Sequence, residues 1–287
     1  SHFVAANSRG FLGGYPFSRH TISVAPIAGK GNGMQRDDWY TSSRDPKQLA
    51  APEKVGRYAA ERALARLNAR KLNTRTCPVL FEAPLAAGLL GAFVQAVSGG
   101  ALYRKSTFLL DMLGKPVFPS HIQVVEDPHL IGGVGSAPFD DEGVKTVRRK
   151  VISDGVLQGY FLSSYTARKM GMPTTGNAGG AHNLEIVSTA TRRTDDFEGM
   201  LRKLGTGLLV TELMGQGVNY VTGDYSRGAS GYWVEQGVIQ YPVEEITIAG
   251  NMRDMFQQIV AVGTDTLVRG NKTTGSILIE NMVIAGN

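Results

Sequence analysis

The side chains that most often carry out chemistry in proteins are few and far apart in this chain. Its 287 residues include five histidines and one cysteine. No two histidines have the close spacing of a helical zinc motif such as His-Glu-x-x-His. Residue types and spacing therefore predict no local metal site at these six positions, which are His2, His20, Cys77, His121, His129 and His182.

Nucleophilic catalysis is not indicated either. Cys77 stands at the entry to an apolar segment, where a buried structural thiol is expected. Ser136 and Ser230 each lack one glycine of the Gly-x-Ser-x-Gly turn found in many hydrolases. His182 follows two glycines, so we expect it in an exposed loop. Residue types and spacings alone thus identify no enzyme.

One glycine-flanked segment, Gly223 to Gly228, has the composition of a ligand-binding loop. It places an acid, an aromatic ring and a base between flexible glycines. We predict that Asp224, Tyr225 and Arg227 contact a substrate there. The alternative is a plain hairpin connection whose tyrosine packs on its neighbour.

The net charge of +5 comes from a single segment. The chain has 30 basic and 25 acidic residues, and residues 34–75 contain ten basic residues against five acids, which accounts for the whole excess. This segment predicts an amphipathic helix that begins at Pro52, covers a sheet and exposes a basic ridge of Arg62, Arg66 and Arg70 to water. The alternatives are that the ridge binds nucleic acid or gyrase, or an acidic protein partner.

The elements that would position these residues are mostly strands joined by tight turns. Residues 78–82 predict a buried strand, and an apolar helix follows from Pro84 to about Val97. Asp154-Gly155 predicts a type I′ hairpin. We further expect short helices over 163–170, 195–204 and 252–260, and strands over 184–190, 207–213, 218–222, 231–235, 238–241, 244–249 and 277–284. The pattern predicts an α+β fold, mostly antiparallel sheet with a few packed helices.

Composition excludes several other classes of protein. Apolar residues make up 42% of the chain, enough for a packed core, and the 36 glycines have no collagen-like period. The longest apolar stretch, residues 83–97, is interrupted by proline and glycine, so we expect no membrane span. The lone cysteine and the absence of a signal-peptide pattern predict a cytoplasmic location. Because the sequence opens Ser-His-Phe without Met, we expect that an N-terminal part is missing.

Four longer segments are specific enough to indicate a family. Over the whole chain the sequence resembles the TldD/PmbA family, and within it the PmbA (TldE) branch. The resemblance rests on CPVLFEAPLAAGLLGAFVQAVSGG (residues 77–100), ARKMGMPTTGN (167–177), GQGVNYVTGDYSRGASGYWVEQG (215–237) and ILIENMVIAGN (277–287).

The resemblance implies a zinc peptidase made of two different subunits, of which this chain is the non-catalytic one. In the catalytic TldD branch, a helix carries His-Glu-x-x-x-His, whose histidines bind zinc while the glutamate acts as general base. The matching positions here are Gly91, Ala92 and Ala96, which can neither bind zinc nor accept a proton. The family's late cysteine ligand has no counterpart between residues 271 and 286.

The resemblance also implies domains and partners. Residues 1–75 would end an N-terminal region, and residues 76–287 would correspond to the peptidase domain of the catalytic homologue. Together they would form the C-terminal two-thirds of a full-length member. We expect a TldD-like partner that holds the zinc, with no direct nucleic-acid contact and a homodimer when the chain is isolated. Expected substrates are unfolded or extended peptides, as in antitoxin degradation and peptide-antibiotic maturation. Family members were also described as modulators of DNA gyrase.

Overall fold

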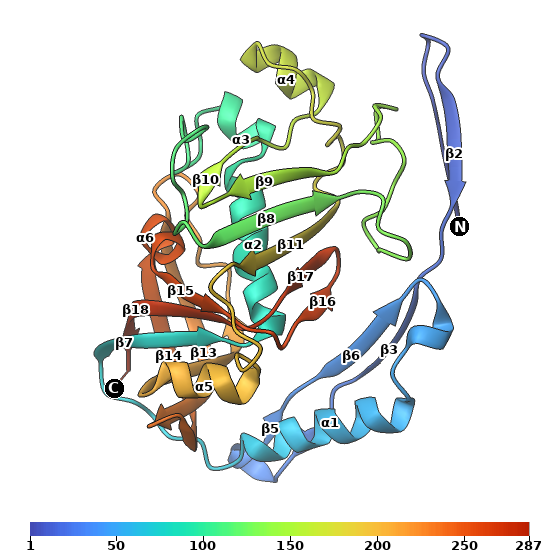
Figure 1. Ribbon diagram of the computed structural model, residues 1–287. Helices are drawn as coiled ribbons and strands as arrows, with labels where there is room; N and C mark the ends of the chain where they lie inside the picture. Colours follow the sequence, from blue (N-terminus) through green and yellow to red (C-terminus); the bar gives the residue numbers. More distant parts are fainter. Residues whose placement is uncertain (287) are drawn as a thin grey trace.

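The fold consists of two six-stranded sheets, an apolar helix that packs against both, and an N-terminal region laid along one side (Figure 1). The computed structural model describes residues 1–286. Most strand pairs are antiparallel, and the parallel pairs are β7 (Arg75–Phe81) with β12 (Gly207–Met214) and β11 (Asn183–Ser188) with β17 (Lys272–Thr274). The predicted α+β class is confirmed.

The first sheet has the order β10-β9-β8-β11-β17-β16. Its first two strands form the predicted hairpin, in which Asp154 and Gly155 both have positive φ (50° and 76°), as a type I′ turn requires. The remaining bounds are β8 (Ile122–Asp127), β9 (Arg149–Ser153), β10 (Val156–Leu157) and β16 (Leu267–Arg269).

The second sheet closes on itself. Its order is β14-β13-β12-β7-β18-β15, and β14 also pairs with β18, with Thr247 opposite Ala285 and Ala249 opposite Val283. Because the sheet closes, backbone N–H and C=O groups at the edges of its longest strands find hydrogen-bond partners. The bounds are β13 (Asp224–Glu235), β14 (Val238–Asn251), β15 (Ile259–Val262) and β18 (Ile277–Ala285).

Successive side chains of β7 point to opposite faces of the sheet and pack into two different hydrophobic cores. Val79 and Phe81 face the main core, while Leu80 faces a smaller core with Met200 and Leu204 of α5 (Phe197–Leu204). This is the period of two that a strand covered on both faces needs. The smaller core holds α5 on the outside of the closed sheet.

Helix α2 (Ala83–Ala96) is the apolar helix predicted to follow the buried strand. Proline in its first turn starts it, and its packing face is made of small, aliphatic and aromatic residues such as Ala86, Leu90 and Phe93. The other helices of this part are α3 (Gly99–Tyr103), α4 (Ser164–Met170) and α6 (Met252–Gln257).

Several sequence predictions in this part are wrong in their bounds, and three of them show why. Residues 218–222 form a turn, with one isolated bridge from Val218 to Tyr225, because neighbouring backbone groups bond within the turn. The strands expected over 238–241 and 244–249 are one continuous strand, β14. Helix α6 ends at Gln257, three residues early, since Ile259 already pairs with β18.

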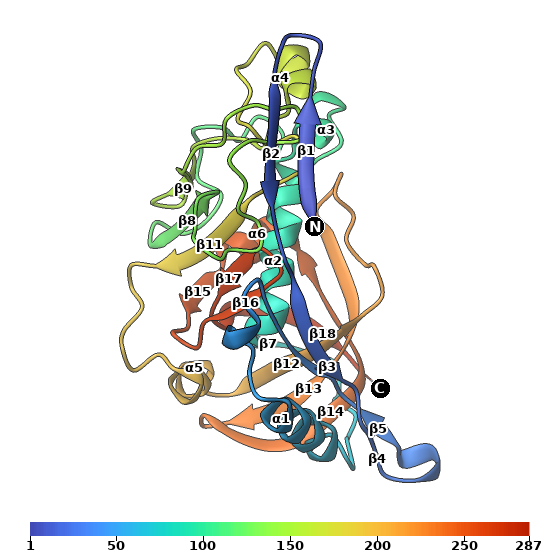
Figure 2. The same cartoon turned by 90° about the vertical axis from the view of Figure 1, so that its right-hand side faces the viewer.

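The N-terminal region consists of short antiparallel pairs and one helix (Figure 2). Helix α1 (Pro52–Ala65) packs against β3, β4 and β6 through the apolar stripe of Val55, Ala59 and Ala63. The strand bounds are β1 (His2–Ala6), β2 (Leu12–Pro16), β3 (His20–Val24), β4 (Ile27–Ala28), β5 (Gln35–Arg36) and β6 (Trp39–Ser43). No helix within residues 1–286 is long and apolar enough to cross a membrane.

Candidate functional site

The positions that the resemblance matches to the zinc motif, Gly91, Ala92 and Ala96, lie in the second half of α2. Ala92 and Ala96 are buried in the main core, and Gly91 is half-buried. A Cβ built on Gly91 would lie 3.5 Å from Cε and 4.0 Å from Nζ of Lys272. The side chain of Lys272, in β17, therefore lies against α2 at Gly91, the position matched to the motif's first residue.

This arrangement does not fit a zinc ion. Within residues 1–286 no three His, Cys, Asp or Glu side chains are grouped so that they could hold a metal. The charged group nearest to Gly91 is an ammonium, which repels a divalent cation. Its Nζ donates a hydrogen bond to Oδ1 of Asn271 at 3.1 Å, and burial lowers the pKa of Lys272.

The three histidines of the C-terminal part have structural partners. His121 contacts the Ser188 hydroxyl at 2.8 Å, and His129 contacts the Thr146 hydroxyl at 3.2 Å. The prediction of an exposed His182 is wrong, because this ring is buried between the carbonyl oxygens of Gly135 and Gly176, at 3.2 and 3.0 Å. Loop packing that spans more than forty residues buries it, and local sequence gives no sign of that.

A buried carboxylate that the sequence analysis missed organises the same loops. Glu126 of β8 is 1% exposed and accepts hydrogen bonds from Arg149 Nε at 2.7 Å, Asn177 Nδ2 at 2.7 Å and the His182 amide at 2.8 Å. These bonds satisfy a carboxylate that would otherwise be costly to bury. Glu126 thus holds the loop of residues 176–182 on the sheet, and no spacing rule could have paired residues so distant in sequence.

Cys77 is buried in β7, as the sequence predicted. Burial raises the pKa of its thiol to about 11. At neutral pH the thiol is therefore protonated and a poor nucleophile.

The predicted substrate loop at residues 223–228 is not a loop. Strand β13 begins at Asp224, because its pairing with β14 extends back to Asp224 opposite Asn251. The first residues of this paired strand therefore include Asp224, Tyr225 and Arg227. Strand alternation exposes Asp224 and buries Tyr225, whose pKa burial raises to about 12 although the charge of Arg227 partly offsets the effect. The three side chains therefore do not converge on one side of the strand, and their role as substrate contacts stays a prediction.

The prediction of a basic helical face in water is wrong for Arg62 and Arg66, because both are paired with acids. Helix α1 ends at Ala65, so Arg66 is its C-cap and Arg70 lies beyond the helix, in a bridge to Val243. Arg62 contacts Glu82 at 2.6 Å and Asp37 at 3.3 Å, with 12% of its side chain exposed. Arg66 forms an ion pair with Glu212 and lies 3.8 Å from Asp37. Arg70 stacks over the ring of Tyr241 at 4.7 Å. The acids that pair with the ridge come from three other segments, which helix periodicity cannot reveal.

This ion network leaves little support for a nucleic-acid surface on α1. Burial alone would lower the pKa of Arg62, but the hydrogen bonds and charge of Glu82, with the charge of Asp37, raise it above its ordinary value. The arginine is therefore held charged inside the protein, where it joins α1 to the start of α2. Phosphate binding would need guanidinium groups that are free to reach the ligand.

Comparison with known protein families assigns the chain to a family of metallopeptidases. The family model described as PmbA/TldA metallopeptidase C-terminal domain matches residues 74–286, and the model of the central domain matches residues 1–67. The chain belongs to this family of metallopeptidases.

Two relatives named as PmbA metalloproteases are similar in sequence over nearly the whole of this chain. The chain is 52% identical to Metalloprotease PmbA of Escherichia coli O157:H7, over 100% of this chain and 63% of the relative. It is 49% identical to the Metalloprotease PmbA homolog of Haemophilus influenzae, over 99% of this chain and 62% of the relative. The chain thus spans less than two thirds of the length of these relatives.

Solved structures share the fold closely. One from Bacteroides thetaiotaomicron, described as a proposed modulator of DNA gyrase, is 29% identical with a TM-score of 0.90, covering 98% of this chain and 63% of that chain. TldE from Thermococcus kodakarensis is 23% identical with a TM-score of 0.85, covering 99% of this chain and 67% of that chain. At this identity, the similarity to TldE is evidence for a shared fold.

Proposed function

We propose that this chain is the non-catalytic subunit of a zinc metallopeptidase made of two different subunits, in which a TldD-like partner holds the zinc. The observation that carries the proposal is the surface of α2, where Gly91, Ala92 and Ala96 replace the motif and Lys272 lies against the first of them. A chain with this surface can stabilise a partner and bind substrate, but it cannot activate water on a metal.

We infer that the substrates are unfolded or extended peptides, such as an antitoxin or the precursor of a peptide antibiotic. A sheet-rich subunit can bind such chains through main-chain hydrogen bonds with little choice of sequence. The closed second sheet leaves its longest edges paired, so a short edge strand such as β16, which packs beside α2, is where such a chain would add. A description as a gyrase modulator would then reflect peptides that act on gyrase.

Co-expression with a homologue that carries His-Glu-x-x-x-His tests this proposal. We expect a complex whose mass equals one or more copies of each chain, with zinc in proportion to the homologue alone. Cleavage of an unfolded peptide should require the homologue's glutamate. The proposal is wrong if this chain alone binds stoichiometric zinc and cleaves the peptide, or if it stays a homodimer in the presence of the homologue.

A further inference from the structure

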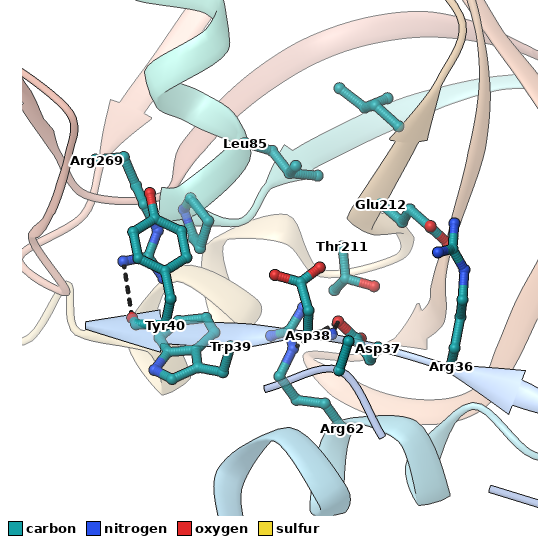
Figure 3. A pocket seen from close by; sticks show the side chains of 13 residues that line it. Arg36, Asp37, Asp38, Trp39, Tyr40, Arg62, Leu85, Thr211, Glu212 and Arg269 are labelled. Atoms are coloured by element: carbon teal, nitrogen blue, oxygen red, sulfur yellow. Dashed lines mark hydrogen bonds and ion pairs between the residues drawn. The ribbon is translucent and has the colours of Figure 1, made fainter. Parts of the chain in front are cut away.

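A cavity of about 390 Å³ lies where the N-terminal region meets α2 (Figure 3). Its walls are residues 36–40 around the start of β6, the first turn of α2, the end of β12 and Arg269 of β16. Ligand sites in proteins have volumes of roughly 300–1,000 Å³. The cavity is therefore large enough for a small ligand, and it lies one turn or more along α2 from the zinc-motif positions.

Half of the charged side chains in this cavity already have ionic partners. Six charged residues line it, and Arg62, Asp37 and Glu212 belong to the ion network of α1. Within residues 1–286 the other three, Arg36, Asp38 and Arg269, have no ion pair. Arg36 and Asp38 are exposed, whereas Arg269 is half-buried, so its free charge is the costly one.

Arg269 is held in place by aromatic rings, and no acid among residues 1–286 forms an ion pair with it. Its guanidinium lies 4.4 Å from the ring centre of Trp39 and 4.1 Å from that of Tyr40. Its one hydrogen bond to the described residues goes to the Tyr40 carbonyl oxygen, at 3.5 Å. A guanidinium has five N–H donors in a planar fork. Most of these donors are therefore free, on a side chain whose orientation is set by stacking.

The β16–β17 hairpin that carries Arg269 gives a second, independent indication that an anion binds there. Arg269 pairs directly with Lys272 across β16 and β17, so both side chains lie on the face that packs toward α2. Like charges directly opposite each other destabilise a strand pair. Burial lowers the pKa of both groups. An anion bound at Arg269 would offset the half-buried positive charge on this face.

The surroundings select the kind of anion. The three acids that line the cavity, Asp37, Asp38 and Glu212, balance its three arginines, so it has no excess positive charge to hold a dianionic phosphate. A carboxylate carries a single charge and matches the guanidinium fork with two parallel hydrogen bonds. The apolar walls, Leu85 and Leu213, suit an aliphatic side chain next to that carboxylate.

We propose that this cavity binds a short peptide, with its terminal carboxylate on Arg269 and its amino group at the unpaired carboxylate of Asp38. The ligand bridges the N-terminal region and the sheet domain, and it requires neither zinc nor a partner subunit. The same carboxylate chemistry would also be offered by a small organic acid, which lacks the amino group that Asp38 would bind.

Calorimetric titration of this chain with trileucine tests the proposal. We expect trileucine to bind, trileucine amide to bind at least about tenfold more weakly because the charge-assisted pair is lost, and N-acetyl trileucine to be weakened as well. Arg269→Gln should reduce the affinity by the same factor, and Asp38→Asn should reproduce the effect of acetylation. The matched control is Arg148→Gln, an exposed arginine whose one ion pair in the described part of the chain is with Asp127.

Three outcomes would overturn the proposal. The first is no binding of trileucine, and the second is equal binding of the acid and the amide, which is measured on the unaltered chain and so does not depend on a variant folding. The third is equal affinity for 4-methylpentanoate, which would make the site one for small organic acids. Circular dichroism melting of Arg269→Gln checks that a loss of binding is not a loss of fold.

Discussion

At the scale of single residues, the charge next to Gly91 on α2 is of the opposite sign to that of an anionic zinc ligand. Zinc needs several neutral or anionic ligands that converge on one point. Here the corresponding region of α2 has hydrogen, two methyl groups and a nearby ammonium. The missing ligands could be identified in the sequence, whereas the ammonium of Lys272 could not.

Replacing Gly91 with histidine would measure the field of that ammonium. The half-buried site has room, since a Cβ there meets Lys272 at an ordinary contact distance of 3.5 Å. A neighbouring cation disfavours the protonated imidazole, so we expect the pKa of the introduced ring to fall below the usual value of about 6.5. Titration followed by NMR checks this.

The control for this experiment is the double variant Gly91→His with Lys272→Met. It removes the charge and keeps a long side chain in place. The pKa of the introduced imidazole should then rise relative to the single variant. Identical titration curves for the two variants would show that the ammonium does not act at this position.

The ion pair between Arg62 and Glu82 makes a second prediction. Both side chains are about nine-tenths buried, with 12% and 11% exposed. Arg62→Ala leaves Glu82 buried without its partner, so we expect the free energy of unfolding to fall by about 3–5 kcal/mol. Urea denaturation measures the change.

Lys71→Ala is the matched control for Arg62→Ala. The pair of Lys71 with Glu245 is exposed, at 51% and 66%, and should contribute no more than about 1 kcal/mol. If both variants lose the same stability, the buried network does not join α1 to α2 as described.

At the scale of elements, two glycines illustrate how neighbouring backbone decides the effect of one methyl group. A Cβ on Gly231 of β13 would lie 1.9 Å from the Leu209 carbonyl oxygen of β12. A Cβ on Gly88, exposed on α2, meets nothing within 4 Å. The same substitution should therefore have opposite effects in the two elements.

We expect Gly88→Ala to raise the free energy of unfolding by about 0.5–1 kcal/mol, because alanine restricts the unfolded chain and favours the helix. Gly231→Ala should lower it by about 1–3 kcal/mol, because the strands must separate to admit the methyl group. Chemical denaturation of both variants checks the signs. A stable Gly231→Ala variant would contradict the close strand contact.

At the scale of the whole molecule, the β1–β2 hairpin is attached to the rest of the chain through an aromatic cluster. Phe139 contacts Phe11, Tyr15 and Phe3 with ring centres 5.0, 5.5 and 6.1 Å apart. Each such pair adds about 0.5–1.5 kcal/mol beyond its buried area. The hairpin otherwise projects from the body (Figure 1).

Phe139→Ala should therefore release the hairpin without unfolding the core. We expect the amides of residues 2–16 to exchange with solvent about tenfold faster or more, while those of β7 and β18 stay protected. Hydrogen exchange read by mass spectrometry measures both regions. The control is Phe17→Ala, an exposed ring outside the cluster, and unchanged hairpin exchange in Phe139→Ala would contradict the attachment.

Much of the architecture could be predicted from local patterns. The apolar run after Cys77, the Asp154-Gly155 turn and the short helix expected over 163–170 each depend on neighbours a few residues away, and the structure confirms all three. Strand bounds were less predictable, because where a strand ends depends on its partner. β13 begins at Asp224 only because β14 extends to Asn251.

The sequence by itself determined the α+β class, the family and the absence of metal ligands on α2, since these follow from residue types at short spacings. The tertiary structure alone decided which charges are free. It paired Arg62 and Arg66 with acids from distant segments, placed Lys272 against Gly91 and, among residues 1–286, left Arg269 without an ion pair. The reason is that electrostatic energy depends on distance in space and on burial, and both are set by packing between elements.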